Sequence, residues 1–248
     1  IQGMILQILA NLYSIKSKNL YKIFHFKKHE KKEDNKFYKN FFSATLGSST
    51  LHLSAFIDTW LASFLISGSI SYLYYANRVF QLPLAIFAIA TSIALFPMIA
   101  RAIKNKDENR ALSLMKKSSM ILFVVLSISM LIGIIFNDFI VKTLFERGAF
   151  TSEDSANTAL ILTMYLLGLL PFGLAKIFSL WLYANEQQFL SAKISMKSLA
   201  WNIVFSLILI KPYGAAGLAF ASTLSGFILF YLTIKAFGFQ KFIIMFKK

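Results

Sequence analysis

The sequence predicts an all-α, polytopic helical membrane protein, and three observations lead to this fold class. Of the 248 residues, 57% are hydrophobic and only 15% are charged, which is more apolar surface than a soluble domain of this length can bury. Several uncharged runs approach the roughly 20 residues that a helix needs to cross a bilayer. Segments of about 10 alternating residues, which would indicate a membrane β-barrel, do not occur in the sequence.

The apolar runs predict one partial span and six complete ones. The partial span covers 1–15, and a basic connecting segment follows at 16–40. The complete spans are expected near 41–66, 79–100, 118–136, 157–182, 192–210 and 214–234, which gives a six-helix lobe at 41–237 and a basic tail at 238–248. In lipid, backbone groups must bond within their own segment, so each run should be helical. Because the chain begins inside an apolar run and without methionine, we expect it to be a fragment of a longer protein.

The basic residues predict an orientation. Segment 16–39 carries nine lysines, connection 101–117 carries six basic residues, and further lysines begin the 192–210 span and end the chain. The alternate connections contain only Arg78, Lys142, Arg147 and Lys211. Because Lys and Arg are in excess in cytoplasmic loops, we expect 16–39, 101–117 and the C-terminus to be cytoplasmic. This pattern explains the net charge of +15 without a nucleic-acid partner. Segment 20–41 fits either an interfacial helix or a solvated loop.

The 41–66 span carries a polar stripe. Its members recur every three or four residues and therefore share one helical face: Ser43, Gly47, Thr50, Ser54, Asp58 and Ala62. Small residues let helices pack closely in lipid, whereas a carboxylate near the bilayer centre costs roughly 2.5–3.5 kcal/mol and is usually paired or in a wet cavity. Asp58 is therefore interpreted either as a cation or proton site or as a structural hydrogen-bond partner. His52 lies on another face and is interpreted as a packed histidine.

The 79–100 span begins directly after an arginine. Arg78 precedes an uncharged run that contains Pro83 and Pro97, and both prolines predict kinks. Helical spacing places Tyr74, Arg78, Gln81 and Ala85 on one face, next to Asn77. The Arg78 guanidinium either anchors the helix at the membrane interface or binds two phosphate oxygens at the same time.

Two further spans have local signals. Pro171 predicts a kink in the 157–182 span, and Lys176 in the same span either extends to the headgroups or forms a second cavity cation. In the connection FERGAFTSED (145–154), Thr151 and Asp154 fit a capping box. The stretch KPYGAAGLAF (211–220) predicts a tight turn on the outer side, with Gly214 and Gly217 at the start of the next helix.

The sequence does not favour an enzyme. There is no cysteine and no Gly-Lys dipeptide, which excludes thiol chemistry and a Walker phosphate loop. The stretch HEKKE (29–33) lacks the second histidine of a zinc protease motif. We therefore expect a transporter.

Several stretches resemble one family: DTWLASFLISGSISYLYYANRVFQLPLAIF, ALFPMIAR, LFERGAFT, GLLPFGLAKIFSLWLYA and YGAAGLAFASTLSG. Over about 41–239, they are similar to the bacterial lipid II flippases of the MurJ/MviN type, in the superfamily of multidrug, oligosaccharidyl-lipid and polysaccharide exporters. The resemblance implies the second six-helix lobe of a two-lobe flippase, plus the end of the preceding helix, with the N-terminal lobe absent. It also implies transport of lipid II, the undecaprenyl-pyrophosphate-linked peptidoglycan precursor. This would pass from the inner to the outer leaflet of the bacterial cytoplasmic membrane by alternating access, for cell wall synthesis.

The resemblance also assigns residues. Arg78 falls where the family has a cavity arginine for the pyrophosphate, and we expect Tyr74, Asn77, Gln81 and Lys176 to contribute to substrate binding. Asp58 resembles a sodium-site position, and the resemblance places its partners among Asn202, Ser206, Ser222 and Thr223. No cofactor is expected beyond coupling to sodium, protons or membrane potential, and the expected partners are lipid II, membrane lipids and the N-terminal lobe. The alternatives are an exporter of drugs or other polysaccharide lipids, and a non-transporting scaffold for cell-wall synthases.

Overall fold

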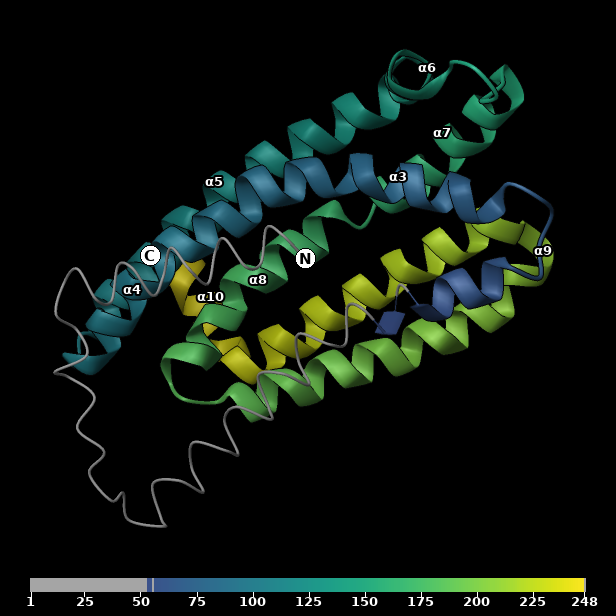
Figure 1. Ribbon diagram of the computed structural model, residues 1–248. Helices are drawn as coiled ribbons and strands as arrows, with labels where there is room; N and C mark the ends of the chain where they lie inside the picture. The colour runs from purple at the N-terminus through teal and green to yellow at the C-terminus, as the bar shows by residue number, and fades with distance from the viewer. Residues whose placement is uncertain (1–52, 55, 248) are drawn as a thin grey trace, which may run out of the picture. The chain divides into compact units, whose positions relative to one another are not determined.

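The computed structural model describes residues 53–54 and 56–247, and this part of the chain contains helices and no strand (Figure 1). A helical segment at 56–62 is followed by turns at 63–68. The remaining elements are α3 (Ser69–Pro83), the π-helical η2 (Leu84–Ile89), α4 (Ala90–Lys104), α5 (Glu108–Ile135), α6 (Asn137–Phe145), α7 (Ser152–Leu166), α8 (Leu169–Ala184), α9 (Gln188–Phe237) and α10 (Phe239–Lys247).

Four helical runs in the described part are long and apolar enough to cross a membrane: Ser69–Lys104, Glu108–Ile135, Ser152–Ala184 and Gln188–Phe237. The last run contains two predicted spans, because α9 reverses at Gly214, where φ is 54° and ψ is −133°. This backbone conformation suits glycine and is strained for other residues. The predicted all-helical membrane fold class is confirmed, whereas segments 1–15 and 16–40 and His52 lie outside the described residues.

Side chains fix where helices begin. Asp107 caps α5 by accepting a 3.0 Å hydrogen bond from the backbone N–H of Arg110. At the start of α7, the Thr151 hydroxyl accepts from the Asp154 N–H, and the Asp154 carboxylate accepts from the Thr151 N–H. The predicted capping box is therefore confirmed.

The prolines act differently from one another. The helix expected over 157–182 ends at Leu166 and restarts at Leu169, because Pro171 has no N–H to donate to the carbonyl of Leu167. Pro83 is followed by the π-helical turn of η2, whereas Pro97 lies inside α4, which continues without a break. The interruption is confined to Leu167 and Gly168, which keep right-handed helical angles, and the run continues from Ser152 to Ala184, as expected for the predicted kink.

Two short helices were not predicted. Helix α6 lies between the 118–136 span and the FERGAFTSED connection, and α10 occupies most of the segment predicted as a basic tail. Both have nine residues, too few for a membrane span, so the apolar-run criterion could not detect them.

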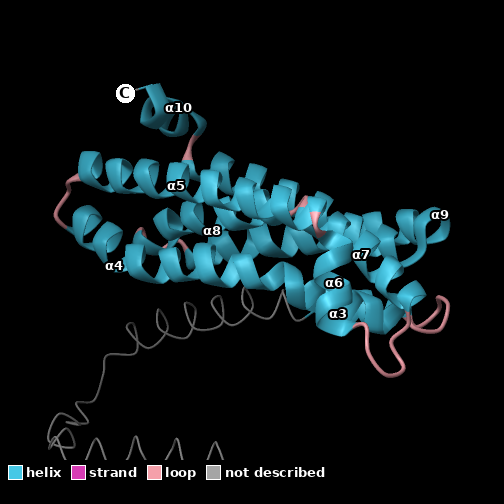
Figure 2. Cartoon of the chain, turned by 90° about the horizontal axis from the view of Figure 1, so that it is seen from above, coloured by secondary structure: helices cyan, strands magenta, loops and turns pink. Residues whose placement is uncertain are grey.

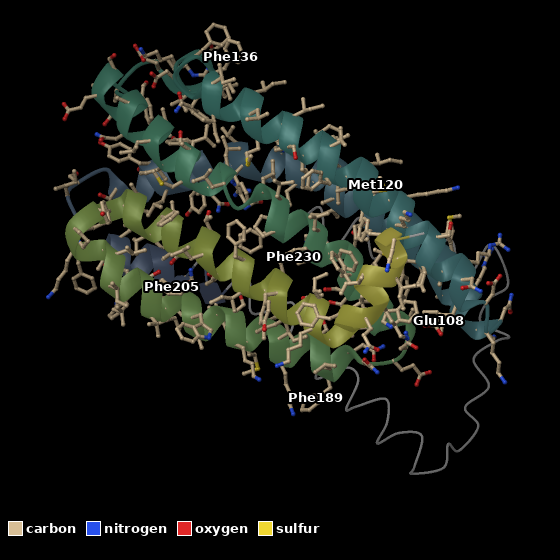
Figure 3. All side chains as sticks on the ribbon, turned by 180° about the vertical axis from the view of Figure 1, so that it is seen from behind. Glu108, Met120, Phe136, Phe189, Phe205 and Phe230 are labelled. Atoms are coloured by element: carbon tan, nitrogen blue, oxygen red, sulfur yellow. The ribbon has the colours of Figure 1, made fainter. Side chains whose placement is uncertain are left out.

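Helix α8 packs against α9, α5, α4 and η2, and α7 packs against α3, α9 and α6. The helices run side by side, and α10 lies beside one end of the bundle (Figures 1 and 2). Glu108 and Phe136 mark opposite ends of α5 in Figure 3. We call the end with Glu108 the α4–α5 end, and the end with Phe136 the α6–α7 end.

Candidate functional site

Helix α3 exposes a polar face. The residues that were predicted to share this face are all exposed: Tyr74, Arg78 and Gln81 on α3, and Ala85 on η2. The guanidinium of Arg78 donates from Nη2 to the Tyr74 hydroxyl at 3.0 Å, and its Cζ lies 4.8 Å from the centroid of the Tyr74 ring. Tyr74 therefore holds the arginine head by a hydrogen bond and by a cation–π contact. We call Tyr74, Asn77, Arg78 and Gln81 the α3 polar face.

The other polar members of this face pair with each other. The Gln81 amide nitrogen donates to the Asn77 amide oxygen one turn earlier. Among the described residues Arg78 forms no ion pair with a carboxylate. Its charge is thus positioned by neutral groups and can still be neutralised by an anion.

Lys176 lies apart from this arrangement. It is half-buried in the middle of α8 and, in the described part of the chain, forms no hydrogen bond or ion pair. The structure thus shows no contact that joins Lys176 to the α3 polar face.

Asp58 is buried at the junction of its own helix with both arms of α9. Its Oδ1 accepts a long hydrogen bond of 3.5 Å from the Ser206 hydroxyl, and its Oδ2 accepts one of 3.2 Å from the Ser222 hydroxyl. Ser206 precedes the reversal at Gly214 and Ser222 follows it. The carboxylate therefore joins three helical segments.

Asn202 extends this network. Its Nδ2 donates to the Ser222 hydroxyl at 3.2 Å, and its Oδ1 accepts from the Ser54 hydroxyl at 3.2 Å. Thr223 behaves differently, since its hydroxyl donates at 2.6 Å to the backbone carbonyl of Met164 on α7. Of the predicted cation-site residues, the structure joins Asn202, Ser206 and Ser222 with Asp58, and it directs Thr223 elsewhere.

The chemistry of this network suits a small hard cation. Carboxylate, hydroxyl and amide oxygens are the donors that such ions prefer. Asp58 is the network's one carboxylate, and among the described residues no group of three or more His, Cys, Asp or Glu side chains could hold a metal ion. A single negative charge fits a monovalent cation or a proton better than a divalent metal.

Sequence reasoning missed Tyr165 on α7. This residue is buried, its ring stacks on Phe80 of α3 with centroids 5.7 Å apart, and it lies within electrostatic range of Asn77 and Asp58. It thus stands between the α3 polar face and the Asp58 network. In the sequence it is one more tyrosine in an apolar run, and only the packing of α7 against α3 gives it this position.

Comparisons with known proteins agree with one another. A family described as lipid II flippase MurJ matches residues 1–248. A probable lipid II flippase MurJ of Helicobacter pylori strain J99 is 50% identical over 236 residues, which are 95% of this chain and 51% of the relative. A second, from Haemophilus influenzae, is 33% identical over 195 residues and covers 76% of this chain and 38% of the relative.

Solved structures show the same relationship. A lipid II flippase MurJ in an inward closed conformation aligns with a TM-score of 0.73 and 25% identity, covering 92% of this chain and 51% of that one. An outward-facing multidrug transporter of the MATE family aligns with a TM-score of 0.71 at 17% identity, over 80% of this chain and 44% of that one, which shows a shared fold. The chain spans about half the length of these Helicobacter pylori relatives.

Proposed function

The chain belongs to the lipid II flippase MurJ family, and from this premise we propose that it forms one lobe of a transporter that moves lipid II from the inner to the outer leaflet of the bacterial cytoplasmic membrane. The second lobe would be an N-terminal half of the same protein, since the chain spans only about half the length of its relatives. The two lobes would alternate between access to either side, and the lipid precursor delivered outside would serve cell wall synthesis.

The observation that carries this proposal is the α3 polar face. Elsewhere α4 and α5 expose mainly apolar side chains such as Ile93, Phe123 and Ile135, which suits contact with lipid. A pyrophosphate needs a different surface, because an anion in hydrocarbon must be compensated by charge and hydrogen bonds. Arg78, held by Tyr74 and flanked by Asn77 and Gln81, offers a fork of donors to phosphate oxygens.

We place the α4–α5 end in the cytoplasm, because six basic residues lie within 101–117 and α10 adds further lysines. The α6–α7 end would then face outward, at the level of Arg78. In this orientation a membrane potential that is negative inside favours outward movement of an anion, by about 2.3 kcal/mol per charge per 100 mV.

The test uses the full-length protein in cells depleted of their own flippase. Lipid II exposed on the outer leaflet is measured for wild type, Arg78→Ala and Arg78→Lys. We expect exposure to be lost in Arg78→Ala and partly kept in Arg78→Lys, because lysine keeps the charge but loses the bidentate fork. Lys142→Ala, an exposed basic residue on α6, is the matched control and should transport normally.

The alternatives give other outcomes. Normal lipid II exposure in both Arg78 variants would contradict substrate binding and leave Arg78 as an interfacial anchor. Drug efflux without a cell-wall defect on depletion would indicate a drug exporter. Retained capture of cell-wall synthases, with Arg78 and Asp58 both replaceable, would indicate a scaffold.

The Asp58 network supports a second proposal, that transport is coupled to a monovalent cation or to protons. A cation bound by Asp58, Ser206 and Ser222 would fix both arms of α9 to the 56–62 helix. Asp58→Asn should therefore transport slowly and lose any dependence on sodium or pH. If Asp58→Asn matched wild type at every sodium concentration and pH, the coupling proposal would be wrong.

A further inference from the structure

A small pocket at the α6–α7 end is used by neither proposal. It has a volume of about 230 Å³ and is bordered by the turn at 63–68, the first turns of α3, α7 and both arms of α9 around their reversal at Gly214. Small-molecule sites are usually larger, at roughly 300–1,000 Å³, whereas one water molecule takes about 30 Å³. The pocket therefore has room for several waters or a hydrated ion, and not for a bulky ligand.

Both arms of α9 run from the Asp58 network to this pocket. On the first arm, Ser206 of the network and Tyr213 of the pocket wall are seven residues apart, and on the second arm Ala215 of the wall and Ser222 of the network have the same separation. Residues seven apart share a helical face, and seven residues rise about 10 Å. The pocket therefore lies about two helical turns from Asp58, on the same side of both arms.

The helix that carries Asp58 ends at the same pocket. Ala62 follows Asp58 by one turn, and its carbonyl accepts a 3.1 Å hydrogen bond from the N–H of Leu65, a wall residue. On the two arms of α9, Ile210 and Ala219 lie between the network and the wall in the same way. Ala62 is 1% exposed and Ala219 is 0% exposed. This layer closes the pocket from Asp58, although two of its three side chains are single methyl groups.

Polar groups accompany the pocket. Ser69 and Asn157 belong to its wall. Thr158, next to Asn157 on α7, has a buried hydroxyl with no hydrogen-bond partner among the described residues. Buried polar atoms that lack a protein partner are commonly satisfied by water, so we expect this part of α7 to be hydrated.

We propose that this pocket is the outer entrance through which a monovalent cation reaches Asp58, and that Ala62, Ile210 and Ala219 form the barrier inside it. The inference rests on the proposed coupling through Asp58. The wall offers oxygen atoms from Ser69 and Asn157 to an ion that is losing its water, and the oxygens of the Asp58 network receive it about 10 Å further in. Because the barrier is one side-chain layer thick and mostly alanine, a small separation of the α9 arms opens it.

The test uses Ag⁺, a thiol-reactive monovalent cation close in size to Na⁺, in nitrate buffer. It is added to spheroplasts that contain the full-length protein, so that only the outer face of the membrane is exposed. This chain has no cysteine, any cysteine of the N-terminal lobe is replaced, and Ala219→Cys places one thiol in the barrier. Loss of maleimide reactivity after unfolding measures how much of the thiol has reacted with silver.

We expect Ala219→Cys to react with silver from outside, and Ala62→Cys, on the opposite side of the barrier, to do the same. Adding Ala216→Phe, which fills the pocket from its wall, should slow both reactions about tenfold, because overpacking raises the barrier to passage. No reaction at either thiol, or equal rates with and without Ala216→Phe, would overturn the proposal.

Two matched variants control for burial and for bulk. Ala175 on α8 is also buried, at 2% exposure, but lies outside the pocket and its barrier, so Ala175→Cys should not react. Ala156→Phe adds the same bulk to an exposed position of α7 that is not in the wall, and it should leave the rate at Ala219→Cys unchanged. Reaction of Ala175→Cys as fast as that of Ala219→Cys would refute a defined route.

Sodium separates this inference from the coupling proposal. Sodium in place of choline should slow the reaction at Ala219→Cys, because an ion bound at Asp58 occupies the end of the route, and Asp58→Asn should abolish this protection. A rate that depends on Ala216→Phe but not on sodium would contradict sodium coupling and keep the entrance. A rate that depends on sodium but not on Ala216→Phe would keep the coupling and overturn the entrance.

Discussion

The α7–α8 pair and α5 are both apolar enough to cross a membrane, yet they occupy opposite environments. In their most apolar stretches, 61% of the α7–α8 residues are buried inside the protein, against 22% for α5, although α5 is the more hydrophobic of the two. In lipid, apolar character does not drive a helix inward, because the surrounding chains are equally apolar. Which helix becomes central is decided by close packing and by polar contacts.

Small residues explain how other helices pack closely against α8. A Cβ on Gly173 of α8 would lie 2.2 Å from the Leu126 side chain of α5, and one on Gly168 would lie 2.8 Å from the Thr223 hydroxyl. Helices can approach α8 this closely because these positions have no side chain. Four substitutions test this contrast between α5 and the α7–α8 pair, and they are given in order of decreasing expected loss of stability.

The largest effect is expected for Phe178→Ala on α8. Phe178 is 1% exposed and its ring contacts Phe230, Phe237 and Phe242, so truncation leaves a cavity that costs about 2–4 kcal/mol. The free energy of unfolding is measured by denaturant titration in mixed micelles. The matched change Phe123→Ala, on the half-exposed face of α5, should alter it by less than about 0.5 kcal/mol. Similar losses for both would refute the contrast.

Overpacking the centre should come next. Gly173→Ala forces Leu126 to move, and we expect a loss of about 1–3 kcal/mol in the same titration. Ala94→Val adds volume on the exposed side of α4 and serves as the control. An unchanged free energy of unfolding for Gly173→Ala would mean that α5 and α8 are more loosely packed than the structure shows.

A polar contact of the centre can be removed without changing volume. In Thr223→Val, the Met164 carbonyl near the end of α7 loses its 2.6 Å side-chain donor, which should cost about 1 kcal/mol. Thr233→Val is the control, because that hydroxyl bonds to Leu229 within its own helix. Equal effects of the two changes would show that the contact between α7 and α9 contributes nothing beyond a local bond.

The smallest effect is expected at the edge of the bundle. Lys241 of α10 forms a 2.7 Å ion pair with Glu108 and lies 4.8 Å from the Trp181 ring centroid. Both partners of the ion pair are about half exposed, so Lys241→Gln should cost no more than about 1 kcal/mol, and less at high salt. Lys247→Gln, on the same helix, is the comparison. A loss as large as that of Phe178→Ala would make α10 part of the structural centre.

The sequence predicted the membrane class, the helical runs and the Thr151–Asp154 capping box, because each depends on neighbouring residues. It could not predict that the α7–α8 pair is central, since mean hydropathy does not follow burial: α7–α8 at 1.9 is 61% buried in its most apolar stretch, whereas α9 at 1.8 is 22% buried. It also favoured no choice between Ser222 and Thr223, which are adjacent and chemically alike. The orientation of α9 against the Asp58 helix directs one to the carboxylate and the other to Met164.

The residues of the candidate site also divide into those that local sequence predicts and those whose roles depend on distant contacts. Helical spacing predicted the α3 polar face, of which Tyr74, Arg78 and Gln81 are exposed and Asn77 is half-buried. The roles of Tyr72 and Tyr165 depend on partners more than 80 residues away, Asp154 and Phe80. No local pattern carries that information.

The length of one helical run determines where Arg78 lies relative to the hydrocarbon of the membrane. Ser69–Lys104 is 36 residues long, or about 54 Å at 1.5 Å per residue, whereas the hydrocarbon of a bilayer is about 30 Å thick. The uncharged stretch from Val79 to Ala100 matches that thickness, so the turns before it must stand in the headgroups and in water. The length of the run therefore places Arg78 at the membrane surface, and it places Tyr75 and Tyr72, one and about two turns earlier in α3, outside the hydrocarbon.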